Sequence, residues 1–156
     1  MPNYVDNLVT FTGYYHELEP YAYAVSKGKL LRCIKPMSET AEQSANDIWG
    51  TKWDVYDPQP VFMRDDHCAD IYQLHMQFES AWAPPIGAYE MLNEQNIEVY
   101  AVCMESGGLD FAGEYVNGEY RQWELKDCPH HIYTMFQKYY DWDRIRNQTH
   151  PDCKVA

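Results

Sequence analysis

Two short strings hold the side chains best suited to binding chemistry. One is WGTKWD at residues 49–54, and the other is FESAWAPP at residues 78–85. Tryptophan offers a large amphipathic ring, and a lysine ammonium binds well over the face of such a ring. The candidate binding residues are Trp49, Lys52, Trp53, Asp54, Ser80 and Trp82. Two interpretations stay open: a recognition patch, because Trp is a preferred interface anchor, or a core corner in which Gly50 makes a tight turn.

No residue is assigned a catalytic role. Ser80 follows an expected strand and precedes an expected helix, but no G-x-S-x-G surrounds it, and the chain has no glycine-rich phosphate-binding motif. Carboxylates that can pair as acid and base are Glu79, Glu105, Asp110 and Glu114. In a chain with so many acidic residues, such pairs arise by chance. A small enzyme or nucleotide-binding domain with a Trp-rich pocket is kept as the alternative to a binding protein.

Two groups contain metal-ligand residue types. The first is Cys128, His130, His131, His150 and Cys153, and the second is DDHCAD at residues 65–70. The first lacks the usual spacing of paired zinc ligands, and the second lacks the glycine and closing glutamate of a calcium loop. We expect neither a metal nor a cofactor.

The cysteines and the N-terminal residues indicate a reducing compartment. Five cysteines, with no C-x-x-C pair, fit reduced thiols better than a disulfide framework: Cys33, Cys68, Cys103, Cys128 and Cys153. The first residues lack the basic and apolar regions of a signal peptide, and no apolar run approaches the roughly 18 residues that cross a bilayer. We expect a cytoplasmic protein that does not contact a membrane.

The charge balance limits the classes of partner. The chain has 24 acidic and 12 basic residues, for a net charge of -12. Direct nucleic-acid binding needs cations that displace counterions from phosphates, so we do not expect it. The carboxylates serve solubility alone, or they attract a basic protein surface by imitating phosphates.

Hydrophobic periodicity gives the order of the elements. Strands are predicted at 5–12, 70–78 and 97–104, with an edge strand at 53–63. Helices are predicted from Pro20 to Gly28, over 38–48, from Pro84 to about Asn93 and from Pro129 to about Arg146. Asn117-Gly118 predicts a two-residue hairpin that pairs Val116 with Glu119, Tyr115 with Tyr120, Glu114 with Arg121 and Ala112 with Trp123.

The 156 residues are expected to form one domain. Strand, helix, strand, strand, helix, strand is the ferredoxin-like βαββαβ plan, an antiparallel sheet with helices on one face. The predicted class is therefore α+β, with an added C-terminal hairpin and helix. Residues 1–125 would hold the core and hairpin, 129–146 the C-terminal helix and 147–156 a tail.

Three strings carry a family resemblance. WGTKWD is the most specific, and FESAWAPP and the FAGE string at residues 111–114 accompany it, together with Pro2-Asn3 and Asn7. With these residues the chain resembles the YubB-like ferredoxin-fold family, whose members are small proteins of plasmids and phages. Tyr4 and Val5 replace the Trp-Cys pair that usually follows Pro-Asn in that family. The resemblance implies a fold and a bacterial host cytoplasm, and it implies no activity.

Together these observations predict a non-enzymatic binding protein carried by a phage or plasmid. Its expected partner is a host protein, either a defence protein or one that handles nucleic acid, which it would inhibit through an acidic, aromatic-rich surface. A small-molecule ligand remains open.

Overall fold

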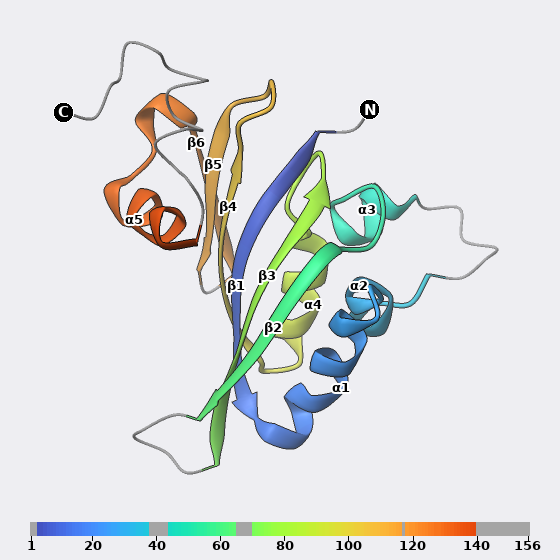
Figure 1. Ribbon diagram of the computed structural model, residues 1–156. Helices are drawn as coiled ribbons and strands as arrows, with labels where there is room; N and C mark the ends of the chain where they lie inside the picture. The colour runs from blue at the N-terminus through green and yellow to red at the C-terminus, as the bar shows by residue number, and fades with distance from the viewer. Residues whose placement is uncertain (1–2, 38–43, 65–69, 117, 140–156) are drawn as a thin grey trace.

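Six antiparallel strands form one sheet in the order β2-β3-β1-β4-β5-β6 in the computed structural model (Figure 1). The structure describes residues 3–37, 44–64, 70–116 and 118–139. The strands are β1 (Tyr4–Tyr14), β2 (Tyr56–Arg64), β3 (Ile71–Ala81), β4 (Glu98–Glu105), β5 (Phe111–Val116) and β6 (Glu119–Glu124). The α+β class and the antiparallel sheet are confirmed, and β2 is an edge strand as its prolines predict.

Helices lie on both faces of this sheet (Figure 1). Four of them cover one face: α1 (Tyr15–Ser26), α2 (Leu30–Ile34), α3 (Ala45–Trp49) and α4 (Ile86–Glu94). The 3-10 turn η1 (Leu125–Asp127) leads into α5 (His130–Tyr139), which lies on the opposite face. None of the helices in the described ranges has the length and apolar character needed to cross a bilayer.

Each helical layer covers its own hydrophobic cluster. The larger cluster lies under α1 to α4 and includes Phe11, Leu74 and Tyr89, all completely buried. The smaller one lies under α5 and includes Val102 and Ile132. The cluster under α5 joins residues of β1, β4 and β5, including Leu8, Val102 and Ala112.

The strand predictions from alternation hold in detail. Leu74, Met76 and Phe78 of β3 are buried on the face that α1 to α4 cover, whereas Gln73 and His75 on the opposite face are only half-buried. The predicted hairpin register is also correct, with Val116 opposite Glu119, Tyr115 opposite Tyr120, Glu114 opposite Arg121 and Ala112 opposite Trp123.

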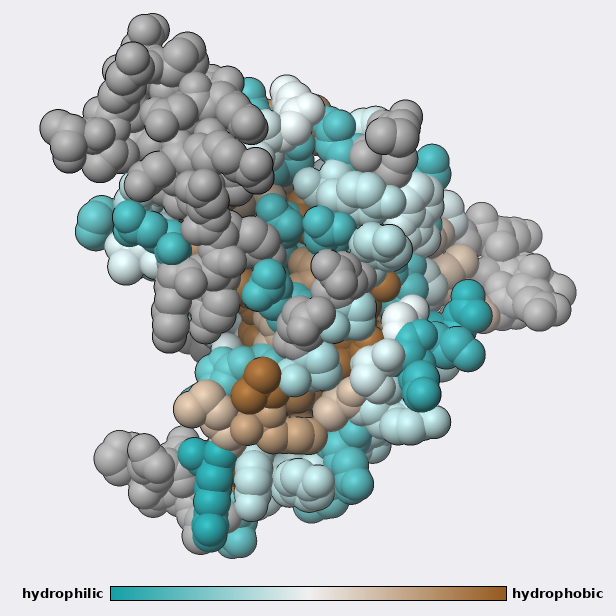
Figure 2. All heavy atoms as spheres, viewed as in Figure 1, coloured by the Kyte–Doolittle hydropathy of each residue, from teal (hydrophilic) through white to brown (hydrophobic). Residues whose placement is uncertain are grey.

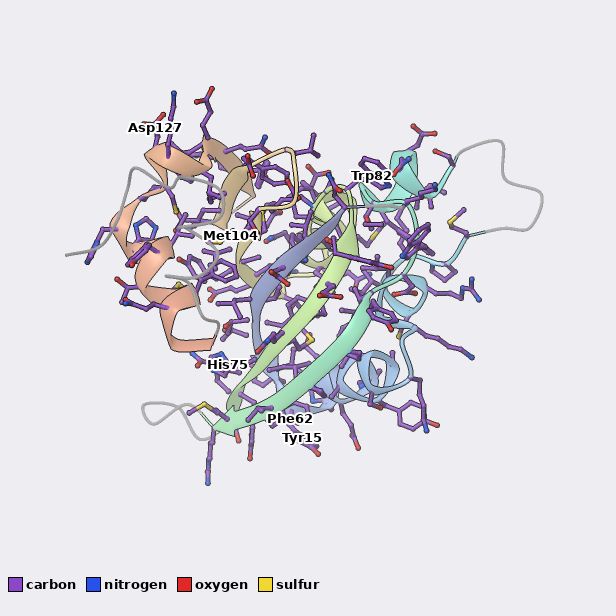
Figure 3. The ribbon with its side chains drawn as sticks, turned by 45° about the horizontal axis from the view of Figure 1, so that its top comes forward. Tyr15, Phe62, His75, Trp82, Met104 and Asp127 are labelled. Carbon is purple, nitrogen blue, oxygen red and sulfur yellow. The ribbon has the colours of Figure 1, made fainter. Side chains whose placement is uncertain are left out.

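The predicted start of the first helix is wrong. α1 begins at Tyr15, directly after β1, and Pro20 lies inside it. The first turn is held by contacts with strands far along the chain: the Tyr15 ring lies 5.2 Å from that of Phe62 and 5.1 Å from that of Tyr72 (Figure 3). Such contacts override the local preference of proline for the first turn of a helix.

The helix predicted over residues 38–48 is also corrected. Residues 38–43 lie outside the described ranges, and the helix observed is α3, with Ser44 rather than Ser38 as its N-cap. The Ser44 Oγ accepts a hydrogen bond from the Asp47 amide, while the Asp47 carboxylate accepts one from the Ser44 amide. This reciprocal capping box fixes the start of the helix.

Candidate functional site

The WGTKWD turn packs against the end of β3. Trp49 is only 3% exposed, and its Nε1 donates a hydrogen bond to the Lys35 carbonyl at 2.8 Å. The Thr51 hydroxyl donates to the Ala81 carbonyl at 2.7 Å, so this bond joins the two strings that the sequence singled out. Trp49 is therefore a core residue.

Two further candidates, Asp54 and Ser80, hold the backbone in place. The Asp54 carboxylate accepts hydrogen bonds from the amides of Leu31 (2.9 Å), Arg32 (3.0 Å) and Val55 (2.8 Å). The buried Ser80 hydroxyl accepts from Asn7 Nδ2 and donates to the Ala83 carbonyl. These contacts use the polar atoms of both side chains, which explains why both residue types are needed structurally.

The other three candidates are exposed. Lys52 Nζ lies 5.3 Å from the centre of the Trp53 ring, in the cation–π arrangement that the sequence suggested, and Trp53 is 37% exposed. Trp82 is 42% exposed and has a φ of +71°. Its amide donates to the Asn3 carbonyl, which places it at the end of the β1–β3 pair (Figure 3). A tryptophan held in the left-handed region at the surface is unusual.

The strand register adds two tyrosines to this end of the sheet. Tyr4 lies opposite Ala81, and Tyr56 lies opposite Glu79. Their rings stack with centres 5.8 Å apart and planes inclined at 25°, and both remain exposed. We call Tyr4, Trp53, Tyr56 and Trp82 the aromatic end.

Three carboxylates lie at the same end of the sheet. Asp6 faces Glu79 across β1 and β3, and burial, followed by the charges of Glu79 and Glu105, raises the pKa of Asp6 to about 7. Glu105 is buried, and its carboxylate accepts hydrogen bonds from the amides of Leu109 (2.7 Å) and Asp110 (2.8 Å). Glu105 therefore anchors the loop between β4 and β5. We call Asp6, Glu79 and Glu105 the acidic cluster.

The sequence analysis missed Tyr4, Asp6 and Tyr56 as site residues. Alternation puts Tyr4 and Asp6 on the less apolar face of their strand, so this much could be inferred. Only the pairing of β1, β2 and β3 shows that Tyr56 and Glu79 join them there.

A groove of about 510 Å³ lies on the same face, toward the other end of the strands. Its lining includes Leu8, Thr10, Val61, Met63, His75 and Met135. The His75 ring is held by Thr10 Oγ1 at 2.8 Å and Gln73 Oε1 at 3.1 Å. Figure 2 shows hydrophobic side chains exposed along β2, where Val61 and Met63 lie.

The groove does not reach the aromatic end. His75 lies seven residues before Trp82 on an extended strand, which at about 3.3 Å per residue separates them by roughly 23 Å. Figure 3 shows the two side chains well apart, with Trp82 beyond the end of β3 and His75 near the middle of that strand. A single pocket that combines Trp82, His75 and carboxylates, which would favour an enzyme, is not formed by the described residues.

Glu114 and Cys103 have structural roles. Glu114 accepts hydrogen bonds from the Tyr100 hydroxyl (2.8 Å) and from His131 (2.5 Å), so it ties α5 to the sheet. Burial raises the pKa of the Cys103 thiol to about 12, which keeps it protonated and unreactive.

The predicted metal-ligand groups are only partly described. His150, Cys153 and residues 65–69 lie outside the described ranges. Within those ranges, no three His, Cys, Asp or Glu side chains gather as metal ligands would.

The arrangement at the sheet end suits recognition of a protein surface. Exposed rings supply contact area with little loss of side-chain entropy. Thr10 contacts His75 and Thr134 contacts His130, while His131 contacts the carboxylate of Glu114. No protein-family model, curated protein or solved structure matches this chain, so its function is inferred from its own residues.

Proposed function

We propose that this protein acts by binding another macromolecule through the aromatic end, while the exposed carboxylates of the chain attract that partner, and that it catalyses no reaction. The observation that carries the proposal is the stacked, exposed pair Tyr4 and Tyr56 at the same end of the sheet as the exposed Trp82. Large rings that stay in water cost free energy in the isolated protein, and interfaces use Trp and Tyr as anchors more than other residues.

The proposed partner has a basic surface. Exposed carboxylates lie on several elements, including Glu19 of α1, Glu90 of α4, Glu98 of β4 and Glu119 of β6. Charge spread in this way attracts a basic protein from many directions, and the aromatic end then fixes where the partner binds. A host defence protein or a nucleic-acid-handling protein has the required charge, and binding would inhibit it.

We also propose that residues 4–105 follow the ferredoxin-like plan and that the chain is a YubB-like protein of a phage or plasmid. The order β2-β3-β1-β4, with α1 and α4 on one face, supports the fold. The WGTKWD string is the part of the sequence that most resembles this family. Its residues form the turn that holds the end of α3 against the end of β3. The step from such a family to inhibition of a host protein is an analogy.

The association rate should depend strongly on salt. The tagged protein is used to capture its partner from a bacterial host extract, the partner is identified by mass spectrometry, and the rate is measured with both purified proteins. Because the net charge of -12 steers the encounter, the rate should fall by about tenfold or more between about 50 and 300 mM salt. A rate that does not change with salt would contradict attraction by charge.

The groove around His75 favours an enzyme as the second candidate function. A histidine held by Thr10 and Gln73 beside exposed apolar side chains can serve as an acid or base toward a bound ligand. Turnover of a nucleotide or nucleic acid by the purified protein, lost in His75→Gln, would establish this candidate and overturn the proposal of binding alone.

A further inference from the structure

A second hollow lies on the helical layer, where α1 turns into α2. Its volume is about 480 Å³, which is within the range of small-molecule sites. It is lined by Tyr23, Ala24, Lys27, Lys29, Arg32 and Cys33. The turn between the helices contains Gly28 with a φ of +67°, and this turn brings Lys27 and Lys29 to the same hollow.

Three of the 12 basic side chains in the whole chain line this one hollow. The sequence contains no Asp or Glu from residue 20 to residue 38, although acidic residues outnumber basic ones two to one overall. The carboxylate of Asp54 contacts this segment, and its oxygens accept hydrogen bonds from the amides of Leu31 and Arg32. More distant carboxylates are screened beyond about 8 Å at physiological salt.

We propose that this pocket binds a small molecule that carries a phosphate and a flat ring, such as a mononucleotide. Lys29 and Arg32 would bind the phosphate, because a guanidinium donates two parallel hydrogen bonds to phosphate oxygens and an ammonium adds a compact charge. Tyr23 is 69% exposed, with Lys27 Nζ 5.7 Å from its ring centre. Its ring offers a surface on which a base can stack.

The thiol in the pocket points to reversible binding. Burial and the charge of Asp54 raise the pKa of Cys33. A thiol that stays protonated at neutral pH is a poor nucleophile, so the ligand is held by charge and stacking without a covalent bond.

Calorimetric titration of the full chain tests the proposal with three probes: AMP, inorganic phosphate and adenosine. AMP should bind more tightly than either of the others, because only AMP engages both the cations and the ring. The double variant Lys29→Gln/Arg32→Gln should weaken AMP binding by about tenfold or more. Tyr23→Ala should weaken AMP binding and leave the binding of inorganic phosphate unchanged.

A matched control distinguishes binding in this pocket from a general effect of removing two positive charges from the surface. The double variant Arg121→Gln/Lys126→Gln removes the same charge from exposed side chains outside the pocket and should bind AMP as the wild type does. Melting temperatures show that every variant is folded. No AMP binding by the wild type, equal loss in both double variants, or adenosine or phosphate bound as tightly as AMP would each overturn the proposal.

Discussion

Replacing Asp6 by asparagine should stabilise the protein at about pH 8 and leave its stability nearly unchanged at about pH 4. The folded state raises the pKa of Asp6 from 3.8 to about 7, mainly by burial and then by the charges of Glu79 and Glu105. The folded protein therefore holds this proton more tightly than the unfolded chain does. Stability is lost as the pH rises from about 4 to about 7, and the loss persists above that window.

The expected gain of Asp6→Asn at about pH 8 is roughly 2–4 kcal/mol in the free energy of unfolding, with the upper value set by 1.36 kcal/mol per pKa unit. Urea unfolding of both proteins at the two pH values measures it. Glu98→Gln removes an equal charge from an exposed position of β4 and serves as the control, with little change expected. Equal stabilisation by Asp6→Asn at both pH values would contradict the raised pKa. A carboxylate kept at such a cost beside exposed rings is typical of a functional surface.

Trp49→Ala and Trp82→Ala should have very different effects on stability. Trp49 is 3% exposed and makes a hydrogen bond through its indole nitrogen, so its truncation should cost about 3–5 kcal/mol. Trp82 is 42% exposed, and its contact with Asn3 uses the backbone, which alanine keeps. Its truncation should cost about 1 kcal/mol or less.

Thermal and urea unfolding of the two variants measure the difference directly. If Trp82→Ala destabilises the protein as much as Trp49→Ala does, the Trp82 ring belongs to the core. Trp82 would then not be part of the proposed binding surface. The comparison thus decides between the two interpretations of the tryptophan strings, a core corner and a recognition patch, for each tryptophan separately.

Local alternation was enough to predict the strands, even β1, whose partners β3 and β4 lie far along the chain. The alternation in β3 and the Asn117-Gly118 turn gave the buried face and the hairpin register correctly. The start of α1 could not be predicted, because the contacts of Tyr15 with Phe62 and Tyr72 that fix it come from strands far along the chain.

The candidate site was also predictable only in part, because some of its residues stand out in the local sequence and others are brought in by strand pairing. The structure brings the two tryptophan strings together at one end of the sheet, where the Thr51–Ala81 hydrogen bond joins them. The sequence did not separate the buried Trp49 from the exposed Trp82, since both occur in similar polar strings. The stacking of Tyr4 on Tyr56 depends on the register of three strands, which no local pattern specifies.

Capture of the partner by matched surface variants tests the central proposal most directly. Tyr4 and Tyr14 lie at opposite ends of β1 with similar exposure, 41% and 50%, so Tyr14→Ala is the control for Tyr4→Ala combined with Trp82→Ala. Each protein is used at equal concentration to bind the identified partner, and its melting temperature is measured in the same preparation. We predict at least about a hundredfold loss of affinity for the double variant, as expected for two interface anchors, and none for Tyr14→Ala. Undiminished binding by a folded double variant would contradict the proposed binding surface.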